Sequence, residues 1–192
     1  MIQQVQKKYD GITGYAFIFS LNDWEELNCI INNILSNGSD IFETPKQGDS
    51  RREYVDLDVA RFVIRKDGHS DLVNEPYSLN ILNIFKRTNF IELIERKTNL
   101  ENLKILRMQL NCMKANSFVG AHIDCEHDSS YKVTAIIRTI SSHSGGELYL
   151  YGDHPQIIKQ ENNSIFLMDS LIEHEVKTVI DGYRNTLVVV LG

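Results

Sequence analysis

The spacing of hydrophobic residues along the chain changes near residue 103. Before this point, two stretches repeat their apolar residues every three or four positions, which is typical of amphipathic helices. After it, short apolar or alternating runs are separated by turn-forming clusters, which is typical of closely spaced strands. The pattern predicts a mainly β fold with N-terminal helices (α+β), in which a sandwich or barrel is supported by the helices.

Two helical regions are expected. The first begins at Asn22, which can cap a helix together with Glu25 three residues later, and it ends before Gly38. The second opens at Glu75-Pro76, with Ser78 as its cap, and ends near Lys97-Thr98. Both helices are expected to pack on one side of a sheet. No linker or repeat separates them from the strands, so we expect one domain covering residues 1–192.

The predicted strands lie mostly in the second half of the chain. In the first half, Tyr15–Phe19 resembles a buried strand and Val55–Val59 a half-buried one, while residues 38–52 form a polar loop. The strands expected after the change in spacing are 103–113, 118–124, 131–140, 147–151, 164–168 and 184–190.

Composition narrows the possible functions. The formal net charge of -6 argues against a nucleic-acid partner held by phosphate contacts. No apolar run approaches the roughly 18 residues of a membrane span, and the N-terminus lacks the pattern of a secretory signal. Three cysteines without CxxC spacing favour neither a disulfide scaffold nor a zinc knuckle. We therefore expect a cytoplasmic protein, with no prediction of its oligomeric state.

His122 and Asp124 are the first candidate metal ligands. In an extended segment, residues two apart point to the same face, so both side chains can bind one cation. With a second histidine, this ligand set suits non-haem Fe(II) with open coordination positions. Short His-x-Asp strings are also common by chance, so the downstream sequence has to decide.

Further motifs follow in a fixed order. Gly145-Gly146-Glu147-Leu148 forms a tight turn entering a strand, His174-Glu175-Val176 supplies a second histidine, and Gly182-Tyr183-Arg184-Asn185-Thr186 begins eight residues after it. With His122-x-Asp124, this series resembles the 2-oxoglutarate- and Fe(II)-dependent dioxygenase superfamily, in particular its prolyl-4-hydroxylase-like branch. The resemblance covers residues 105–192.

The resemblance implies a double-stranded β-helix, or jelly roll (cupin-like), in residues 103–192, with residues 1–102 as helical support and substrate entrance. His122, Asp124 and His174 would be the catalytic metal ligands. Arg184 would bind the distal carboxylate of 2-oxoglutarate, with Thr186 beside it on the same strand face. Fe(II), 2-oxoglutarate and O2 would be required, with ascorbate as an optional cofactor. The implied reaction is hydroxylation of an unactivated C–H bond with release of succinate and CO2.

The chain also departs from the family pattern. Many relatives carry a tyrosine that helps to hold the co-substrate where this chain has Met113; Gln109 or Asn111, on the same strand face, could supply that hydrogen bond. Candidate substrate contacts are Arg138, His127 and Glu147. Arg138 could face the pocket or cap its strand in solvent, and His127 is expected in a loop over the pocket. His69, His143 and His154 are expected to be exposed.

Two alternatives stay open. One is a nucleic-acid- or protein-demethylating oxygenase of the same superfamily. The demethylases that act on nucleic acids usually have a second arginine soon after the first, and Arg184–Val189 lacks it. The other is a non-catalytic jelly-roll binding domain. For an oxygenase, the substrate could be a small molecule, an amino acid or a peptide residue.

Overall fold

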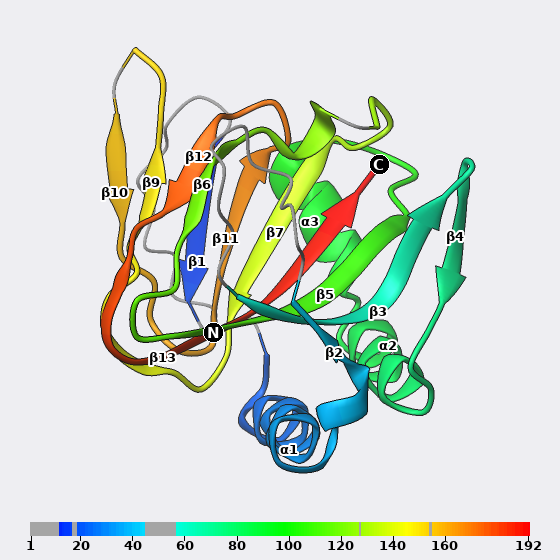
Figure 1. Cartoon of the computed structure of the whole chain (residues 1–192). Coiled ribbons are helices and arrows are strands. Elements are labelled where there is room, and N and C mark those ends of the chain that lie inside the picture. The colour runs from blue at the N-terminus through cyan, green and yellow to red at the C-terminus, as the bar shows by residue number, and fades with distance from the viewer. Residues whose placement is uncertain (1–11, 17–18, 45–56, 127, 154) are drawn as a thin grey trace.

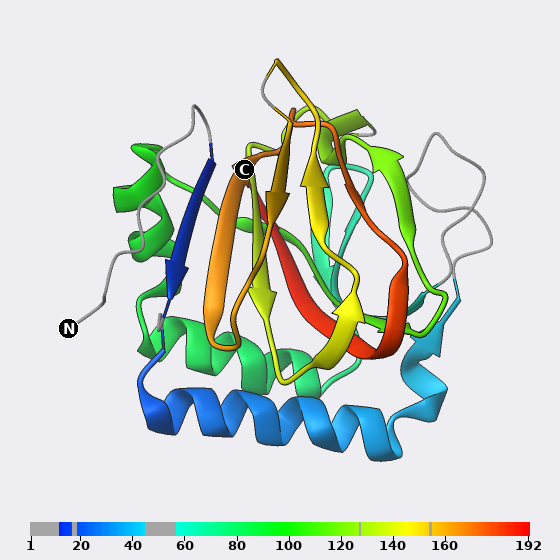
Figure 2. The same cartoon turned by 90° about the vertical axis from the view of Figure 1, so that its left-hand side faces the viewer.

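The computed structural model describes residues 12–16, 19–44, 57–126, 128–153 and 155–192. Two antiparallel sheets lie face to face, and helices cover the outer face of the larger one (Figures 1 and 2). A pocket between the two sheets contains the side chains predicted to bind metal.

The larger sheet has nine strands, and the smaller has four. In the larger sheet the order is β1-β11-β7-β13-β5-β3-β2, with β4 on β3 and β8 on β13; in the smaller it is β10-β9-β12-β6. The strands of the larger sheet are β1 (Ile12–Ala16), β2 (Phe42–Glu43), β3 (Asp58–Lys66), β4 (His69–Leu72), β5 (Ile105–Lys114), β7 (Val133–Arg138), β8 (Ser142–Gly145), β11 (Ser164–Asp169) and β13 (Val179–Leu191). The strands of the smaller sheet are β6 (Val119–His122), β9 (Leu148–Leu150), β10 (Gln156–Ile158) and β12 (His174–Val176).

Three α-helices and two 3₁₀ turns complete the described part of the chain. They are α1 (Leu21–Asn37), α2 (Tyr77–Arg87), α3 (Phe90–Thr98), η1 (Ser39–Ile41) and η2 (Asp124–Glu126). None of the helices among the described residues is long and apolar enough to cross a membrane.

The expected helix ends are partly wrong. The cap of α1 is Ser20, whose hydroxyl accepts a hydrogen bond from the backbone N–H of Asp23, so Asn22 already lies inside the helix. The helix begins two residues earlier than predicted because Ser20 and Asp23 make two hydrogen bonds: the Asp23 backbone N–H donates to Ser20 Oγ, and the Ser20 hydroxyl donates to Asp23 Oδ2. Gly38 ends α1 as expected. The cap of α2 is Pro76 rather than Ser78, which is fully buried in the first turn.

The second helical region is divided in two at Asn89, which has a left-handed backbone (φ 51°) that no α-helix can continue through. Phe85 and Phe90, on either side of this break, stack with their ring centroids 4.1 Å apart. The break therefore lets both helices turn an aromatic side chain into the same core.

Two of the three hydrophobic clusters in the described part of the chain hold the layers together. The first lies between the helices and the larger sheet, where residues such as Leu27, Ile81 and Ile137 are fully buried. The second lies between the two sheets and joins Ile136 of β7 to Leu148 of β9. Helix packing on one side of a sheet is therefore confirmed. Because β7 and β11 are covered on both faces, nearly every residue in them is buried.

The strands predicted after residue 103 are present, with ends shifted by a few residues; β13 extends five residues further back than expected. In the first half of the chain, the strand expected at 15–19 lies at Ile12–Ala16, and its last part falls outside the described residues. The strand expected at 55–59 begins at Asp58 and continues to Lys66, and residues 45–56 are outside the described part. Its length was missed because a bulge between Arg61 and Val63 breaks the alternation of buried and exposed residues. The 42–43 and 69–72 strands were also missed.

Candidate functional site

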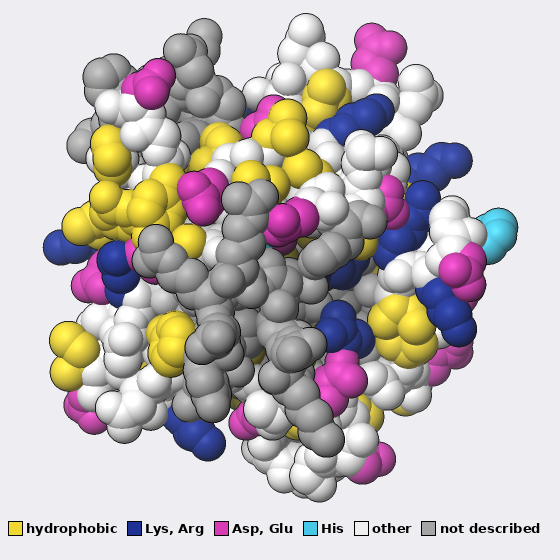
Figure 3. Space-filling view, turned by 45° about the horizontal axis from the view of Figure 1, so that its top comes forward, with side chains coloured by type: hydrophobic (Ala, Val, Ile, Leu, Met, Phe, Trp, Pro, Cys, Tyr) yellow, Lys and Arg dark blue, Asp and Glu magenta, His cyan; other side chains and the backbone are white. Residues whose placement is uncertain are grey.

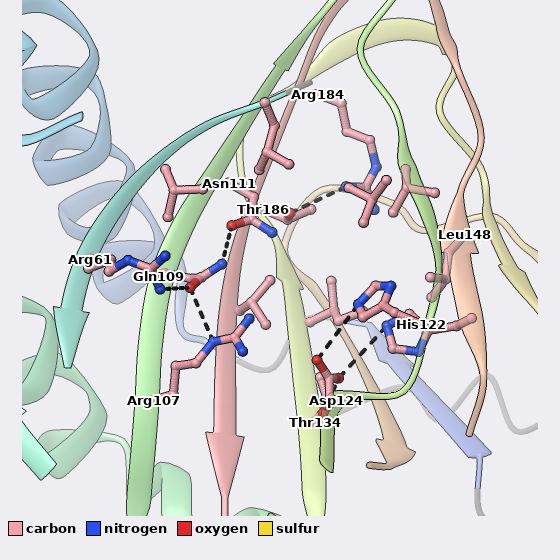
Figure 4. A pocket seen from close by; sticks show the side chains of 17 residues that line it. Arg61, Arg107, Gln109, Asn111, His122, Asp124, Thr134, Leu148, Arg184 and Thr186 are labelled. Carbon is pink, nitrogen blue, oxygen red and sulfur yellow. Dashed lines mark hydrogen bonds and ion pairs between the residues drawn. The ribbon is translucent and has the colours of Figure 1, made fainter. Parts of the chain in front are cut away.

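The pocket between the sheets is lined mainly by β3, β5, β7 and β13 on one side and by β6, β9 and β12 on the other (Figure 4). The described lining residues are Leu57, Val59, Arg61, Arg107, Gln109, Asn111, Val119, His122, Asp124, Thr134, Ile136, Leu148, His174, Val176, Arg184, Thr186 and Val188. All seven residues predicted to bind metal or co-substrate therefore line one cavity.

The three predicted metal ligands lie together at one wall of this pocket. His122 ends β6 and lies directly opposite His174 of β12, while Asp124 opens η2 immediately after β6. All three are buried, and their ligand atoms lie within 4.8 Å of one another. Asp124 Oδ1 is 3.9 Å from His122 Nε2, and its Oδ2 is 3.8 Å from His174 Nε2. These three residues could hold one metal ion.

Backbone contacts fix the tautomer of both histidines. Nδ1 of His122 lies 2.9 Å from the carbonyl oxygen of Gly120, and Nδ1 of His174 lies 2.9 Å from that of Ile172. Because a carbonyl oxygen can only accept, each Nδ1 carries the proton and donates it. In the neutral form of each ring, Nε2 then carries the lone pair on the side of Asp124, which is the usual arrangement of metal-binding histidines.

The surroundings also set the charge of the ligands. Burial opposes ionisation of Asp124, but electrostatic interactions with His174, Arg107 and His122 and a hydrogen bond from Thr134 outweigh it and hold the pKa of Asp124 below its usual value. Burial likewise lowers the pKa of His174, which favours the neutral ring. Oγ1 of Thr134 donates to Asp124 Oδ2 at 2.5 Å and lies 3.1 Å from the Ser170 hydroxyl. A carboxylate and a neutral imidazole are the forms that bind metal.

Arg184 is a buried cation without an acidic partner among the described residues. Its side chain comes from β13, and its Nη1 donates to Thr186 Oγ1 at 3.3 Å and contacts Met113 Sδ at 3.8 Å. Burial, helped by the charge of Arg138, lowers the pKa of Arg184 to about 10, so the guanidinium is still charged at neutral pH. A buried charge normally has a partner of opposite sign. The pocket therefore presents an anion-binding group at this end.

The Gly-Gly turn makes room for Arg184. Gly146 has a positive φ of 67°, and a Cβ added there would lie 3.0 Å from Val179 Cγ2 and 3.1 Å from Arg184 Cδ. A side chain at this position would press on the arginine, so the motif has a steric role in the site.

The residues proposed to replace the family tyrosine lie on the pocket face of β5, as expected. Asn111 and Gln109 both line the pocket, and Gln109 Nε2 donates to Asn111 Oδ1 at 2.7 Å. Met113 contacts the Arg184 guanidinium through its sulfur.

None of the three residues expected to contact substrate is among the described residues that line the pocket. Arg138 is half-buried at the end of β7, donates to the carbonyl oxygen of Gln160 and is not among the described residues that line the pocket, so its contact with substrate stays a prediction. Glu147 is also absent from the described lining, and its carbonyl oxygen accepts from the Lys177 backbone. His127 lies outside the described residues. His143 was wrongly expected to be exposed: its Nε2 is buried, has no hydrogen-bond partner in the part of the chain that the structure describes, and lies near the charge of Arg138.

Two functional candidates were missed. Thr134 was not among the predicted site residues, although a hydroxyl within the apolar run Val133–Ile137 is a signal of a buried polar contact. Arg61 lies in the part of β3 that the alternation did not predict, and no local pattern places it in the pocket.

No known family model and no curated protein matches this sequence. Solved structures do match its fold. An oxidoreductase of the 2OG-Fe(II) oxygenase family from Burkholderia pseudomallei superposes with a TM-score of 0.80 at 21% identity, covering 95% of this chain and 84% of that one. A Pseudomonas putida prolyl-4-hydroxylase gives a TM-score of 0.66 at 12% identity over 94% and 91% of the two chains. The alpha ketoglutarate dependent epimerase SnoN gives 0.70 at 10% identity over 95% and 77%.

At these identities the similarity establishes the fold. The mainly β architecture with N-terminal helices, predicted from the hydrophobic pattern, is confirmed, and so is the jelly-roll core that the family resemblance implied. The structural resemblance to 2-oxoglutarate- and Fe(II)-dependent oxygenases, prolyl-4-hydroxylases included, is confirmed as well.

Proposed function

We propose that this protein is an Fe(II)- and 2-oxoglutarate-dependent dioxygenase. One observation carries the proposal: a buried His-Asp-His cluster and a buried arginine without an acidic partner among the described residues line the same pocket. The first suits a metal, and the second suits a carboxylate. The fold shared with 2OG-Fe(II) oxygenases supports the same conclusion.

The donor set fits Fe(II). His122, Asp124 and His174 offer two imidazole nitrogens and one carboxylate, and their ligand atoms all lie within 4.8 Å of one another. Two histidines and one carboxylate leave coordination positions for co-substrate and O2. Bound there, Fe(II) would supply the O2 chemistry, and 2-oxoglutarate the electrons, with succinate and CO2 released.

The remaining lining has two tasks. Arg184 presents a planar pair of N–H donors, which matches the distal carboxylate of 2-oxoglutarate, and Thr186 accepts one of its hydrogen bonds and so restricts its position. Apolar side chains such as Ile136, Leu148 and Val176 surround the cluster and exclude bulk water from it.

We further propose that the enzyme hydroxylates an unactivated C–H bond of its substrate, which is a small molecule, an amino acid or a peptide residue. The proposed protein is cytoplasmic and has no nucleic-acid partner. Structural neighbours include both prolyl hydroxylases and an epimerase, so the fold accommodates more than one outcome of such chemistry. Ascorbate would serve only to restore the metal to Fe(II).

The test has two steps. Binding of 2-oxoglutarate to the Fe(II)-loaded protein is first monitored without oxygen through the visible metal-to-ligand absorption band. Succinate formation is then measured after O2 is admitted. We expect the wild type to give the band, and Arg184→Gln to need at least about tenfold more 2-oxoglutarate because a charged hydrogen-bonded pair is lost. Arg96→Gln, which removes an exposed arginine from α3, is the matched control. Bound Fe(II) with no absorption band in the wild type would instead indicate a non-catalytic binding domain.

A further inference from the structure

A second cavity lies where the C-terminal half of α1 meets β3, β5 and β13, and Figure 2 shows α1 crossing below the strands of the larger sheet. Its volume is about 320 Å³, and small-molecule sites usually measure about 300–1,000 Å³. The described lining residues are Asn32 and Leu35 of α1, Asp58 of β3, Cys112, Met113 and Lys114 of β5, and Tyr183 and Asn185 of β13, together with Leu57 and Ser117. None of the proposed metal ligands lines this cavity, and neither does Arg184.

Strand register places three polar side chains in one row along this cavity. Asp58 of β3 and Asn185 of β13 are both direct partners of Cys112 in β5. Direct cross-strand partners lie on the same face of a sheet, so the three side chains share one face. The next row on that face consists of Ala60, Leu110 and Leu187, which are fully buried in the core under the helices. The polar row therefore interrupts an apolar face at the position of the cavity.

Asn185 supplies a hydrogen-bond donor that the described part of the protein does not use. Its side chain is 2% exposed and lines the cavity, and its Nδ2 is buried without a partner among the described residues. The backbone of Asn185 is fixed in place, because its N–H donates to the Ser141 hydroxyl and its carbonyl oxygen accepts from the Thr139 hydroxyl. Buried donors without an acceptor are unfavourable and rare. An acceptor atom of a ligand in the cavity would satisfy this one.

The cavity presents both signs of charge, and acidic and basic side chains also lie beside one another on the face of the molecule that Figure 3 shows. Asp58 Oδ1 accepts from the Thr44 hydroxyl at 2.7 Å, and a carboxylate can accept further hydrogen bonds. Burial, helped by the charge of Asp58, raises the pKa of Cys112 to about 12, so this thiol is neutral. Lys114 follows Cys112 by two residues on the same face of β5. The Asp58 side of the cavity thus offers acceptors, and the Asn185 side offers donors.

The width of the polar row limits the size of a ligand that reaches both ends. Neighbouring strands are about 4.8 Å apart, so the backbones of Asp58 and Asn185 lie roughly 10 Å apart with Cys112 between them. Hydrogen bonds of about 2.9 Å at either end leave about 4 Å between the donor and the acceptor of the ligand itself. An α- or β-amino acid carries its ammonium and carboxylate groups at such a spacing.

We propose that this cavity is a second ligand site, separate from the metal pocket, and that it binds a small free amino acid as its zwitterion. The ammonium group donates to the Asp58 carboxylate, and the carboxylate accepts from Asn185 Nδ2, with the Lys114 ammonium group beside it. Among the described residues, only Leu57 lines both cavities, so the two sites adjoin but share no polar group. The inference goes beyond the proposed function, because neither the metal nor 2-oxoglutarate takes part in it.

The experiment measures binding to the full-length protein, free of metal and 2-oxoglutarate, by calorimetry and by saturation-transfer NMR of the ligand. The probes are glycine, L-alanine and β-alanine, beside propionate and propylamine, which each keep only one of the two charges. The variants are Asp58→Asn, Asn185→Leu and, as a matched control, Asp71→Asn, which changes an exposed carboxylate of β4. Thermal unfolding confirms that each variant is folded, and Asp58→Asn tests the site independently if Asn185→Leu does not fold.

We expect at least one of the three amino acids to bind, and propionate and propylamine to bind at least about tenfold more weakly, because each lacks one charged hydrogen-bonded end. Affinity should fall at least about tenfold in Asp58→Asn and in Asn185→Leu, and it should not change in Asp71→Asn. No binding of any amino acid at millimolar concentration would overturn the inference. So would equal affinity for the singly charged probes, or unaltered affinity in Asp58→Asn.

A competition experiment separates this site from the metal pocket. Amino-acid affinity should be the same in Arg184→Gln and in wild-type protein saturated anaerobically with Fe(II) and 2-oxoglutarate. Displacement by 2-oxoglutarate, or loss of binding in Arg184→Gln, would place the amino acid in the metal pocket and overturn the second site. Because the first titrations need neither metal nor 2-oxoglutarate, their outcome does not depend on the proposed oxygenase activity.

Discussion

Replacing Thr134 by valine tests how the chain holds its carboxylate ligand. Valine preserves the branched shape of threonine but removes the hydroxyl that donates to Asp124 Oδ2 at 2.5 Å. Both residues are buried, at 1% and 4% exposure, so water cannot easily replace the lost donor. A hydrogen bond to a charged group contributes about 1.5–3 kcal/mol. Outer-shell partners of metal ligands typically change metal affinity by about 10–100-fold.

We therefore expect Thr134→Val to bind Fe(II) about 10–100-fold more weakly, a loss of about 1.4–2.7 kcal/mol. The loss should grow as the pH falls, because the same hydrogen bond helps to lower the pKa of Asp124. The assay is anaerobic Fe(II) titration by calorimetry, with Co(II) absorption as a second readout. Ser170→Ala is the control, because that hydroxyl contacts Thr134 at 3.1 Å.

A folded Thr134→Val protein that binds metal within about threefold of wild type would refute the reasoning. In that case the hydroxyl would not hold Asp124 in its ligand position. An equal loss in Ser170→Ala would also contradict it, because the effect would then belong to the packing of this region rather than to the bond with Asp124.

Three other changes have defined outcomes. Because burial lowers the pKa of His174 below its ordinary value of 6.5, the unfolded state takes up more protons as the pH falls through 6.5. The melting temperature of the metal-free protein should then drop, and it should drop less in His174→Gln; equal pH slopes would contradict this. Phe85→Ala should lower the free energy of unfolding by about 3–5 kcal/mol in urea denaturation. Leu79→Ala, on the exposed face of the same helix, should change it by about 0.5 kcal/mol or less. Gly182→Ala should destabilise the protein far more than Gly68→Ala: both glycines have positive φ, but only at the first would a Cβ meet a backbone oxygen, at 2.1 Å. Similar melting temperatures for these two variants would exclude that clash.

The local parts of the site could be predicted from the sequence. His122 and Asp124 share a face because two-residue spacing in an extended segment places them there, and the order of the later motifs identified His174 and Arg184. Helical periodicity likewise identified the N-terminal helices, since it depends on residues within one segment. Helix ends were less certain: two capping pairs compete at Ser20 and Asn22, and their sequences alone do not rank them.

Only the tertiary structure decided which strands are neighbours. Arg61 and Gln109 are 48 residues apart in the chain, and a bulge hides the true extent of β3, so nothing local brings this arginine into the pocket. Thr134 reaches Asp124 only because the two sheets pack face to face. Arg138 donates to the carbonyl oxygen of Gln160 because β7 pairs with β11, and Gln160 lies in the segment that leads into β11. Strand pairing is set by the burial of whole faces against two layers, and a single segment does not contain that information.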